Sequence, residues 1–400
     1  MRRILFVDDE PHVLDGLRDL LHKRRREWEM SFALGGQEAL TLLETRPFDV
    51  VISDMRMPGI DGVTLLRLVK ERYPAIARIV LSGQAERDAV VNALPVAHQF
   101  LSKPCDVEVL YAVVERACGL QGLLQDESIR NIIGKVDRLP SLPRTYLEIS
   151  EAASQPDVGL ADIAKIVEKD AAMAVKVLQL VNSSYFGLAQ RQTSVRHAVA
   201  YLGTEMLKAL ALTAQVFVSA TPSIPNFTLD QLQEHSLLTA RIAKRFFREE
   251  TLAYAAFTAG LVHDVGKIIL AMGVRESFEE VVRRAPDAGG QMHRVEKELL
   301  GTSHAEVGAY LLGLWGLPFD IVEAVAYHHH PELVEPTELL IAVHVANALS
   351  QREPGEPAEL EAVGKLNRAV IEGTAWEKVF PGWCALADEE IRAWRREQRN

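Results

Sequence analysis

The sequence predicts two domains of different fold class: a doubly wound α/β domain with a five-stranded parallel sheet over residues 1–120, and an all-α region over residues 136–350. Short apolar runs alternate with helical periodicity in the first segment, whereas only helical periodicity follows residue 136. The length of 400 residues also exceeds what one hydrophobic core usually supports, which favours at least two domains.

Five apolar runs are the expected strands of the first domain. They are residues 4–7, 30–33, 50–53, 79–82 and 100–101. Amphipathic helices are expected between them, such as the helix that carries Val13, Leu14, Leu17, Leu20 and Leu21 on one face. Strands and helices that alternate at this spacing form a parallel sheet covered on both sides.

The remaining segments are also expected to be helical. Residues 121–135 are predicted as a helical linker, and residues 351–400 as a tail of small helices packed on the all-α region. Just before the linker, apolar residues step by three and four, at Leu110, Val113, Ala117, Leu120 and Leu124. This seam either pairs with a second copy of the chain in a homodimer or packs on the core of its own domain.

The bulk composition narrows the function classes. The formal net charge is −11 and no basic stripe is present, so we expect no nucleic-acid partner. The three cysteines lack both a disulfide pattern and metal-ligand spacing. No apolar run approaches membrane-spanning length and no signal-peptide pattern precedes the first strand, so we expect a cytoplasmic protein with no membrane partner.

Acidic residues gather at the carboxyl ends of the expected strands, where parallel sheets of this kind bind ligands. Asp8 and Asp9 follow the first strand and Asp54 follows the third. Their carboxylates are hard oxygen ligands suited to Mg²⁺. With Mg²⁺ bound, one carboxylate can attack a phosphoryl donor, while the ammonium group of Lys103 and the hydroxyl of Ser82 stabilise the transferred group. The pattern therefore predicts a phosphoacceptor site.

Residues 1–120 resemble the receiver domain of two-component response regulators, which has a flavodoxin-like fold. The segments that carry the resemblance are VDDE (7–10), SDMRMPGIDG (53–62), LSG (81–83) and FLSKP (100–104). The resemblance implies that Asp54 is the phosphoacceptor and that Asp8, Asp9, Asp54 and the backbone carbonyl of Arg56 hold Mg²⁺. It also implies that Ser82 and Phe100 are switch residues, and that a cis peptide precedes Pro104. The expected partners are a sensor histidine kinase or phosphotransfer protein and a downstream signalling protein.

Histidine and aspartate residues are scattered over the expected helices of the all-α region. They are His235, His263, Asp264, His304, His328 and His329. Imidazole and carboxylate groups that converge from several helices can bind a divalent transition metal such as Mn²⁺, Fe²⁺ or Zn²⁺. The alternative is that these histidines hydrogen-bond within the core. Gly266, which has no side chain, would let the backbone approach a phosphate group, and Lys267 would place its ammonium group beside that phosphate.

The same region resembles the HDOD module, a relative of the HD-superfamily phosphohydrolases. The resemblance rests on LPSLP (139–143), DAAMAVKVLQLVNSSYFG (170–187), HAVAYLG (197–203), LVHDVGK (261–267), HAEVGAYLLGLWGLP (304–318), YHHHPE (327–332) and HVANAL (344–349). It implies an HD-like helical fold and a signalling output that acts by protein interaction.

The resemblance leaves the question of catalysis open. The six histidine and aspartate residues fall where catalytic relatives place metal ligands, but Asn347 stands where an active enzyme carries an aspartate, and an amide is a neutral, weaker ligand. The Gly-Tyr-Pro signature of cyclic-dinucleotide phosphodiesterases is absent after the histidine run. The competing hypothesis to a protein-binding output is a metal-dependent phosphohydrolase that acts on a nucleotide or cyclic dinucleotide.

Overall fold

The chain forms two compact units in the computed structural model. The structure describes residues 1–400 except 83–92, 94, 120–123, 125–126, 137–144, 146–147, 150, 153–154, 156–157, 184–187, 189–190, 204–206, 208–223, 288–290, 356–365 and 399–400. The first unit is Met1–Arg138 with Gln179–Gln190 and Tyr310–Gly316, and the second is Leu139–Leu178, Arg191–Ala309 and Leu317–Asn400. Because residues 137–144 are not among the described residues, the LPSLP motif at 139–143 lies outside them.

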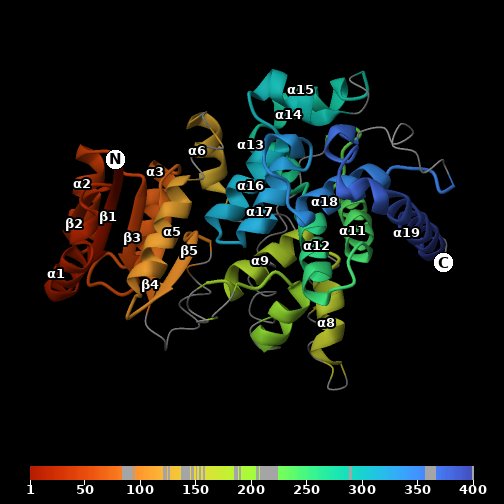
Figure 1. The fold of residues 1–400 in the computed structure, drawn as a ribbon. Coiled ribbons are helices and arrows are strands. Elements are labelled where there is room, and N and C mark those ends of the chain that lie inside the picture. Colours follow the sequence, from red (N-terminus) through yellow and green to blue (C-terminus); the bar gives the residue numbers. More distant parts are fainter. Residues whose placement is uncertain are drawn as a thin grey trace. The chain divides into compact units, whose positions relative to one another are not determined.

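The first unit is built on a parallel sheet of five strands in the order β2-β1-β3-β4-β5 (Figure 1). The strands are β1 (Arg2–Asp8), β2 (Trp28–Leu34), β3 (Val50–Asp54), β4 (Ala77–Ser82) and β5 (Gln99–Ser102). Each contains one of the apolar runs, so the prediction of a doubly wound sheet is confirmed. Parallel crossovers are almost always right-handed, and in this strand order they place helices on both faces of the sheet.

The register of the strands brings the acidic residues to one edge. Val7 of β1 pairs with Ser53 of β3, so Asp8 and Asp54 end neighbouring strands. Ser82 of β4 pairs with Ser102 of β5, and Lys103 follows directly. Because all five strands are parallel, these side chains project from the same carboxyl edge.

Among the residues that the structure describes, four helices connect these strands or directly follow them. They are α1 (Pro11–Leu20), α2 (Gly36–Thr45), α3 (Gly62–Arg72) and α5 (Val107–Gly119), and a 3₁₀ turn, η1 (His22–Arg24), follows α1. In α5, Leu110, Val113 and Ala117 are buried within the chain, and so is Leu124 beyond it. Burial within one chain agrees with packing on the core rather than with a seam for a second copy; Leu120 lies outside the described residues.

The helix α6 (Glu127–Lys135) is anchored on this unit by a buried arginine. Arg78 of β4 is only 1% exposed, and its Nη2 donates a hydrogen bond to the carbonyl of Gly134 at 2.8 Å. Its remaining N–H groups donate to the carbonyls of Pro74 and Val96, among others. A guanidinium group can be buried only where acceptors surround it, so these bonds fix α6 against the strand.

Replacing Gly134 with alanine is expected to detach α6 and destabilise the first unit by about 2 kcal/mol. A Cβ atom at this position would lie 1.8 Å from the carbonyl oxygen of Pro74, so the backbones would have to separate. Hydrogen exchange of α6 and the urea-unfolding midpoint measure the effect. Gly16→Ala is the matched control, because a Cβ atom there meets nothing within 4 Å. Equal protection of α6 in the wild type and Gly134→Ala would contradict this packing.

The second unit is helical, as the sequence predicts. The helices that lie wholly or partly within it are α8 (Leu160–Val167), α9 (Ala171–Val181), α11 (Leu229–Arg245), α12 (Glu250–Val262), α13 (Val265–Gly273), α14 (Arg275–Arg284), α15 (Met292–Leu300), α16 (His304–Leu314), α17 (Phe319–Tyr327), α18 (Glu338–Leu349) and α19 (Ala375–Glu397). The described part of this unit also contains the 3₁₀ turns η4 (Pro331–Leu333) and η6 (Arg368–Val370). The core is built where α12 packs on α11, α17 and α18 (Figure 1).

One stretch of this core has the length and composition of a membrane-spanning helix. It is Glu250–Gly273, which covers α12 and α13, and 89% of its most apolar window is buried inside the protein. The expectation that no apolar run approaches membrane-spanning length is therefore wrong for this stretch. Helices at the centre of a protein are apolar all round for the same physical reason as membrane helices, since neither face contacts water.

The C-terminal segment differs from the expected set of small helices, because most of its described residues form the single 23-residue helix α19. Trp383 stacks on Phe246 with ring centroids 4.6 Å apart. Arg241 of α11 pairs with both Glu390 and Glu397. These contacts along much of its length hold α19 on α11, although Pro381 interrupts its backbone hydrogen bonds.

Candidate functional site

A carboxylate pair and a lysine lie together at the carboxyl edge of the sheet. Asp54 ends β3 and Asp8 ends β1, and both side chains are buried. The Nζ atom of Lys103 lies 2.8 Å from Oδ2 of Asp8 and also pairs with Oδ1 of Asp54. Asp9 is half-buried directly after β1. The structure thus brings the predicted phosphoacceptor together with an acid and an ammonium group.

The charge of Asp54 is not fully compensated. Burial raises the pKa of Asp54, and the neighbouring Asp8 raises it further, although Lys103 and the backbone N–H of Arg56 oppose both effects. The N–H of Arg56 donates to Oδ2 of Asp54 at 2.8 Å. A raised pKa means that this environment still disfavours the carboxylate form. A divalent cation at the edge would supply the missing positive charge, so these residues fit the Mg²⁺ that the resemblance implies.

The two expected switch residues lie on the strands beside this pair. Ser82 ends β4 and Phe100 is in β5, and each is only 1% exposed. The peptide bond between Lys103 and Pro104 is cis, as the resemblance implies. The loop that follows β3 carries Arg56, whose backbone carbonyl is the remaining expected metal ligand.

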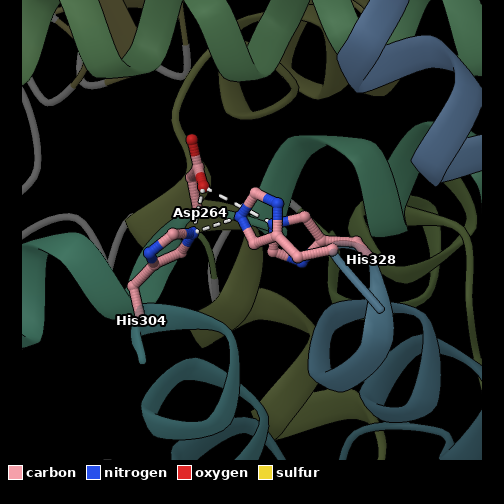
Figure 2. Close-up of side chains that lie close together, drawn as sticks. Asp264, His304 and His328 are labelled. Atoms are coloured by element: carbon pink, nitrogen blue, oxygen red, sulfur yellow. Dashed lines mark hydrogen bonds and ion pairs between the residues drawn. The ribbon is translucent and has the colours of Figure 1, made fainter. Parts of the chain in front are cut away.

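In the second unit, several helix ends bring histidines around one aspartate. Asp264 lies between α12 and α13, and its two oxygens face different histidines. Oδ1 lies 3.1 Å from Nε2 of His304 and 3.9 Å from Nε2 of His328, and Figure 2 shows these three side chains pointing toward one another. Oδ2 lies 3.3 Å from Nε2 of His263 and 3.6 Å from Nε2 of His235.

The hydrogen bonds of two of these histidines fix their tautomers. Nδ1 of His263 lies 2.6 Å from the carbonyl oxygen of Gly260, and Nδ1 of His328 lies 2.8 Å from that of Val325. A carbonyl only accepts, so each Nδ1 carries a proton, and in the neutral form of each ring Nε2 presents a lone pair. Among the described residues, neither Nε2 atom has a hydrogen-bond partner. Lone pairs that face a carboxylate repel it unless a cation lies between them, so these residues fit a metal ion.

The pKa values of the cluster agree with this interpretation. Burial lowers the pKa of His328 and His329 well below the ordinary value and lowers that of His235 to about 3. Burial alone would raise the pKa of Asp264, but His263 and Lys267 outweigh it and hold the pKa well below its usual range. His235, His328 and His329 are therefore neutral imidazoles and Asp264 is a carboxylate, which are the protonation states that ligate metals.

His304 is oriented by an acid that sequence reasoning missed. Oε2 of Glu296, a fully buried residue of α15, lies 2.6 Å from Nδ1 of His304 and accepts a hydrogen bond from its backbone N–H. Burial lowers the pKa of His304, but Glu296 and Asp264 outweigh it and raise the pKa. Carboxylate partners of this kind direct the opposite ring nitrogen toward a metal. Glu296 lies in α15 and His304 begins α16, so periodicity within a single helix does not predict their contact.

The residues after the His-Asp pair have different roles from the one expected. A Cβ atom on Gly266 would lie 1.9 Å from the carbonyl oxygen of His304, so this glycine permits close packing of α13 on α16 rather than approach to a phosphate. Nζ of Lys267 lies 2.5 Å from Oδ2 of Asp264. The ammonium group is therefore a counter-ion of the cluster itself.

Two further polar residues of α18 lie beside the cluster. Asn347, the expected departure from the catalytic pattern, lies beside His235, and its buried side-chain oxygen has no hydrogen-bond partner among the described residues. Nδ1 of His344 donates to the carbonyl of His328, and Nε2 accepts from the N–H of Asn367 at 2.9 Å. His344 is thus saturated with backbone partners and holds the His328 segment in place.

A cavity of 520 Å³ opens beside this cluster. Its walls include His304, His328, His329, Lys267 and Asn347. Several of the histidine edges are therefore accessible from a space large enough for a small molecule.

A doubly wound sheet with clustered acids and a lysine, joined to an all-helical unit, defines a signalling protein of the receiver-and-output class. Two families match the sequence: the response regulator receiver domain over residues 4–115 and the HDOD domain over residues 139–331. The chain is therefore a response regulator with an HDOD output domain.

Individual relatives cover parts of this arrangement. An uncharacterized protein of Treponema pallidum is 27% identical over 232 residues, which are 56% of this chain and 45% of the relative. The hydrogenase transcriptional regulatory protein HoxA of Cupriavidus necator is 38% identical over 125 residues, 31% of this chain and 25% of HoxA. The chain thus spans less than half of the length of these relatives.

One solved structure supports the fold alone. The crystal structure of a virulence factor from Campylobacter jejuni matches with a TM-score of 0.52 at 16% identity, and the match covers 66% of this chain and 99% of that protein.

Proposed function

We propose that this response regulator is phosphorylated on Asp54 with Mg²⁺ as cofactor, and that its HDOD unit acts by binding a downstream signalling protein in the cytoplasm. The observation that carries the first part is the convergence of Asp54, Asp8 and Lys103 at one edge of the sheet. The phosphodonor is a sensor histidine kinase or phosphotransfer protein, the class of partner that receiver domains imply. Matches to regulators such as HoxA agree with a role in signalling.

The chemistry assigns a role to each group at the edge. Asp8, Asp9, Asp54 and the carbonyl of Arg56 would hold Mg²⁺, which supplies positive charge to the transferring phosphoryl group. The carboxylate of Asp54 attacks the phosphorus atom, and the bond from phosphorus to the donor nitrogen breaks with its electron pair leaving on the imidazole. The ammonium group of Lys103 then pairs with an oxygen of the new phosphoryl group.

The response passes through the two buried switch residues. A phosphoryl group on Asp54 offers new acceptor oxygens, and the hydroxyl of Ser82 turns toward them. Movement of Ser82 opens space that Phe100 fills, which repacks β4, β5 and α5. The surface around α5 and the anchored helix α6 then differs between the two phosphorylation states.

The test is a phosphorylation assay with a small phosphodonor such as acetyl phosphate. With Mg²⁺ we expect the intact mass to rise by one phosphoryl group, and peptide mapping to place it on Asp54. Chelation of Mg²⁺ should prevent the reaction, because the acids alone repel the anionic donor. A modification that maps elsewhere, or that forms equally well in excess chelator, would refute the proposal.

The cluster around Asp264 supports a second candidate function, a metal-dependent phosphohydrolase that acts on a nucleotide or cyclic dinucleotide. It is favoured by the unpaired Nε2 atom of His328, which lines the cavity of 520 Å³ together with His304 and His329. His235, His263, Asp264, His304, His328 and His329 would be the ligands of Mn²⁺, Fe²⁺ or Zn²⁺. Asn347 weakens this candidate because it contributes no charge. Hydrolysis that depends on added metal and on His263 would favour the enzyme.

A further inference from the structure

Two groups of ligand atoms share Asp264. One consists of Asp264, His304, His328 and His329, and the other of His235, His263 and Asp264; the ligand atoms of each group lie within 4.8 Å of one another. Each group uses a different oxygen of the aspartate. If the charge of nearby residues is ignored, the two groups could hold two metal ions, one on each oxygen of Asp264.

The ammonium group of Lys267 lies at the second group, which consists of His235, His263 and Asp264. Its Nζ atom is 2.5 Å from Oδ2 of Asp264, the oxygen that also faces His235 and His263. The side chain is 17% exposed, so water screens this charge only in part. An ion bound to the second group would have to displace the ammonium group or be repelled by it at short range.

The charges of the site oppose a second ion for the same reason. Asp264 is the one acid in either group across the part of the chain that the structure describes. The negative charge of Asp264 is offset by a first divalent ion, and Asn347, which lies beside His235, is neutral. A second divalent ion would therefore add two positive charges, with no further carboxylate in either group, beside an existing cation.

We propose that Lys267 is a built-in counter-ion that limits this centre to a single metal ion, held by Asp264, His304, His328 and His329. This inference rests on the metal-binding part of the proposed function and not on phosphorylation of Asp54. Three imidazoles and one carboxylate fill the four positions that Zn²⁺ usually takes in a structural site. The ion then joins the ends of α13, α16 and α17 and has no free position for water activation. Such a centre stabilises a binding surface.

The test measures metal stoichiometry in the full-length protein. Metal-free protein is titrated with Zn²⁺ against a chromophoric chelator, and bound metal is counted by elemental analysis after dialysis. We expect one tightly bound ion per chain in the wild type and in Lys267→Arg, which keeps the cation. Lys267→Met and Lys267→Gln remove the charge and are expected to bind two. Two neutral variants are used so that a folding defect in one does not decide the result, and circular dichroism checks both.

The matched control is Lys297→Met. Lys297 lies in α15, its side chain is exposed, and it forms an ion pair with Glu306 and not with Asp264. This variant is expected to bind one ion. Two ions in the wild type, none in the wild type, or one ion of unchanged affinity in both neutral Lys267 variants would each overturn the inference. Phosphoryl uptake by Asp54 in the same preparations reports separately on the receiver, so failure of either proposal can be distinguished.

Discussion

Phosphoryl uptake from acetyl phosphate is expected to fall below detection when Asp54 is replaced by asparagine. The amide lacks the anionic oxygen that attacks phosphorus, and it removes one of the ligands expected to hold Mg²⁺. Folding should survive the change, because burial raises the pKa of Asp54 and a neutral side chain escapes this penalty. Intact-mass spectrometry measures uptake, and circular dichroism verifies folding.

The matched control for this experiment is Asp61→Asn. Asp61 lies in the loop between β3 and α3, and its side chain caps α3 by accepting a hydrogen bond from the N–H of Thr64 at 2.7 Å. Asparagine caps helices about as well as aspartate, so this variant should keep both fold and uptake. Undiminished labelling of Asp54→Asn, with Asp61→Asn unchanged, would remove the basis for assigning Asp54 as the phosphoacceptor.

The sheet could be predicted because its central strands β3 and β4 are buried on both faces. Residues such as Val50, Val51 and Ile52 have no exposed side, so the strand is visible as a continuous apolar run. The carboxyl-edge rule then places Asp8 and Asp54 together without any knowledge of side-chain geometry. In the first unit, the sequence pattern alone is therefore enough to predict that Asp8 and Asp54 lie together.

In the helical unit, the geometry of the candidate site could not be predicted from the sequence pattern in the same way. The histidines that cluster around Asp264 are visible as a set, but their ligand atoms are aimed by Gly260, Val325 and Glu296, whose contacts depend on how helices end and cross. The pairing of Lys267 with Asp264 also depends on side-chain conformation, although their separation by three residues makes it sterically available. Sequence pattern identified the candidate ligands, and packing determines which of their atoms are free.

The close packing that positions His304 leads to the largest expected loss of stability. Replacing Gly266 with alanine is expected to lower the free energy of unfolding of the second unit by about 3 kcal/mol or more. The added Cβ atom would lie 1.9 Å from the carbonyl oxygen of His304 and 2.8 Å from the backbone nitrogen of Gly308. Both obstacles are backbone atoms, so a change of rotamer cannot relieve the overlap and α13 must move away from α16.

Urea unfolding followed by circular dichroism measures this effect, and Gly382→Ala in α19 provides the comparison. A Cβ atom at Gly382 meets nothing within 4 Å, so this variant should be as stable as the wild type or gain up to about 1 kcal/mol from helix propensity. Separation of α13 from α16 would also move Asp264 away from His304, so Gly266→Ala should bind Zn²⁺ more weakly even where it remains folded. Wild-type stability and wild-type Zn²⁺ affinity in Gly266→Ala would show that these two backbones are not in contact, and the convergence of ligands on Asp264 would then lose its structural basis.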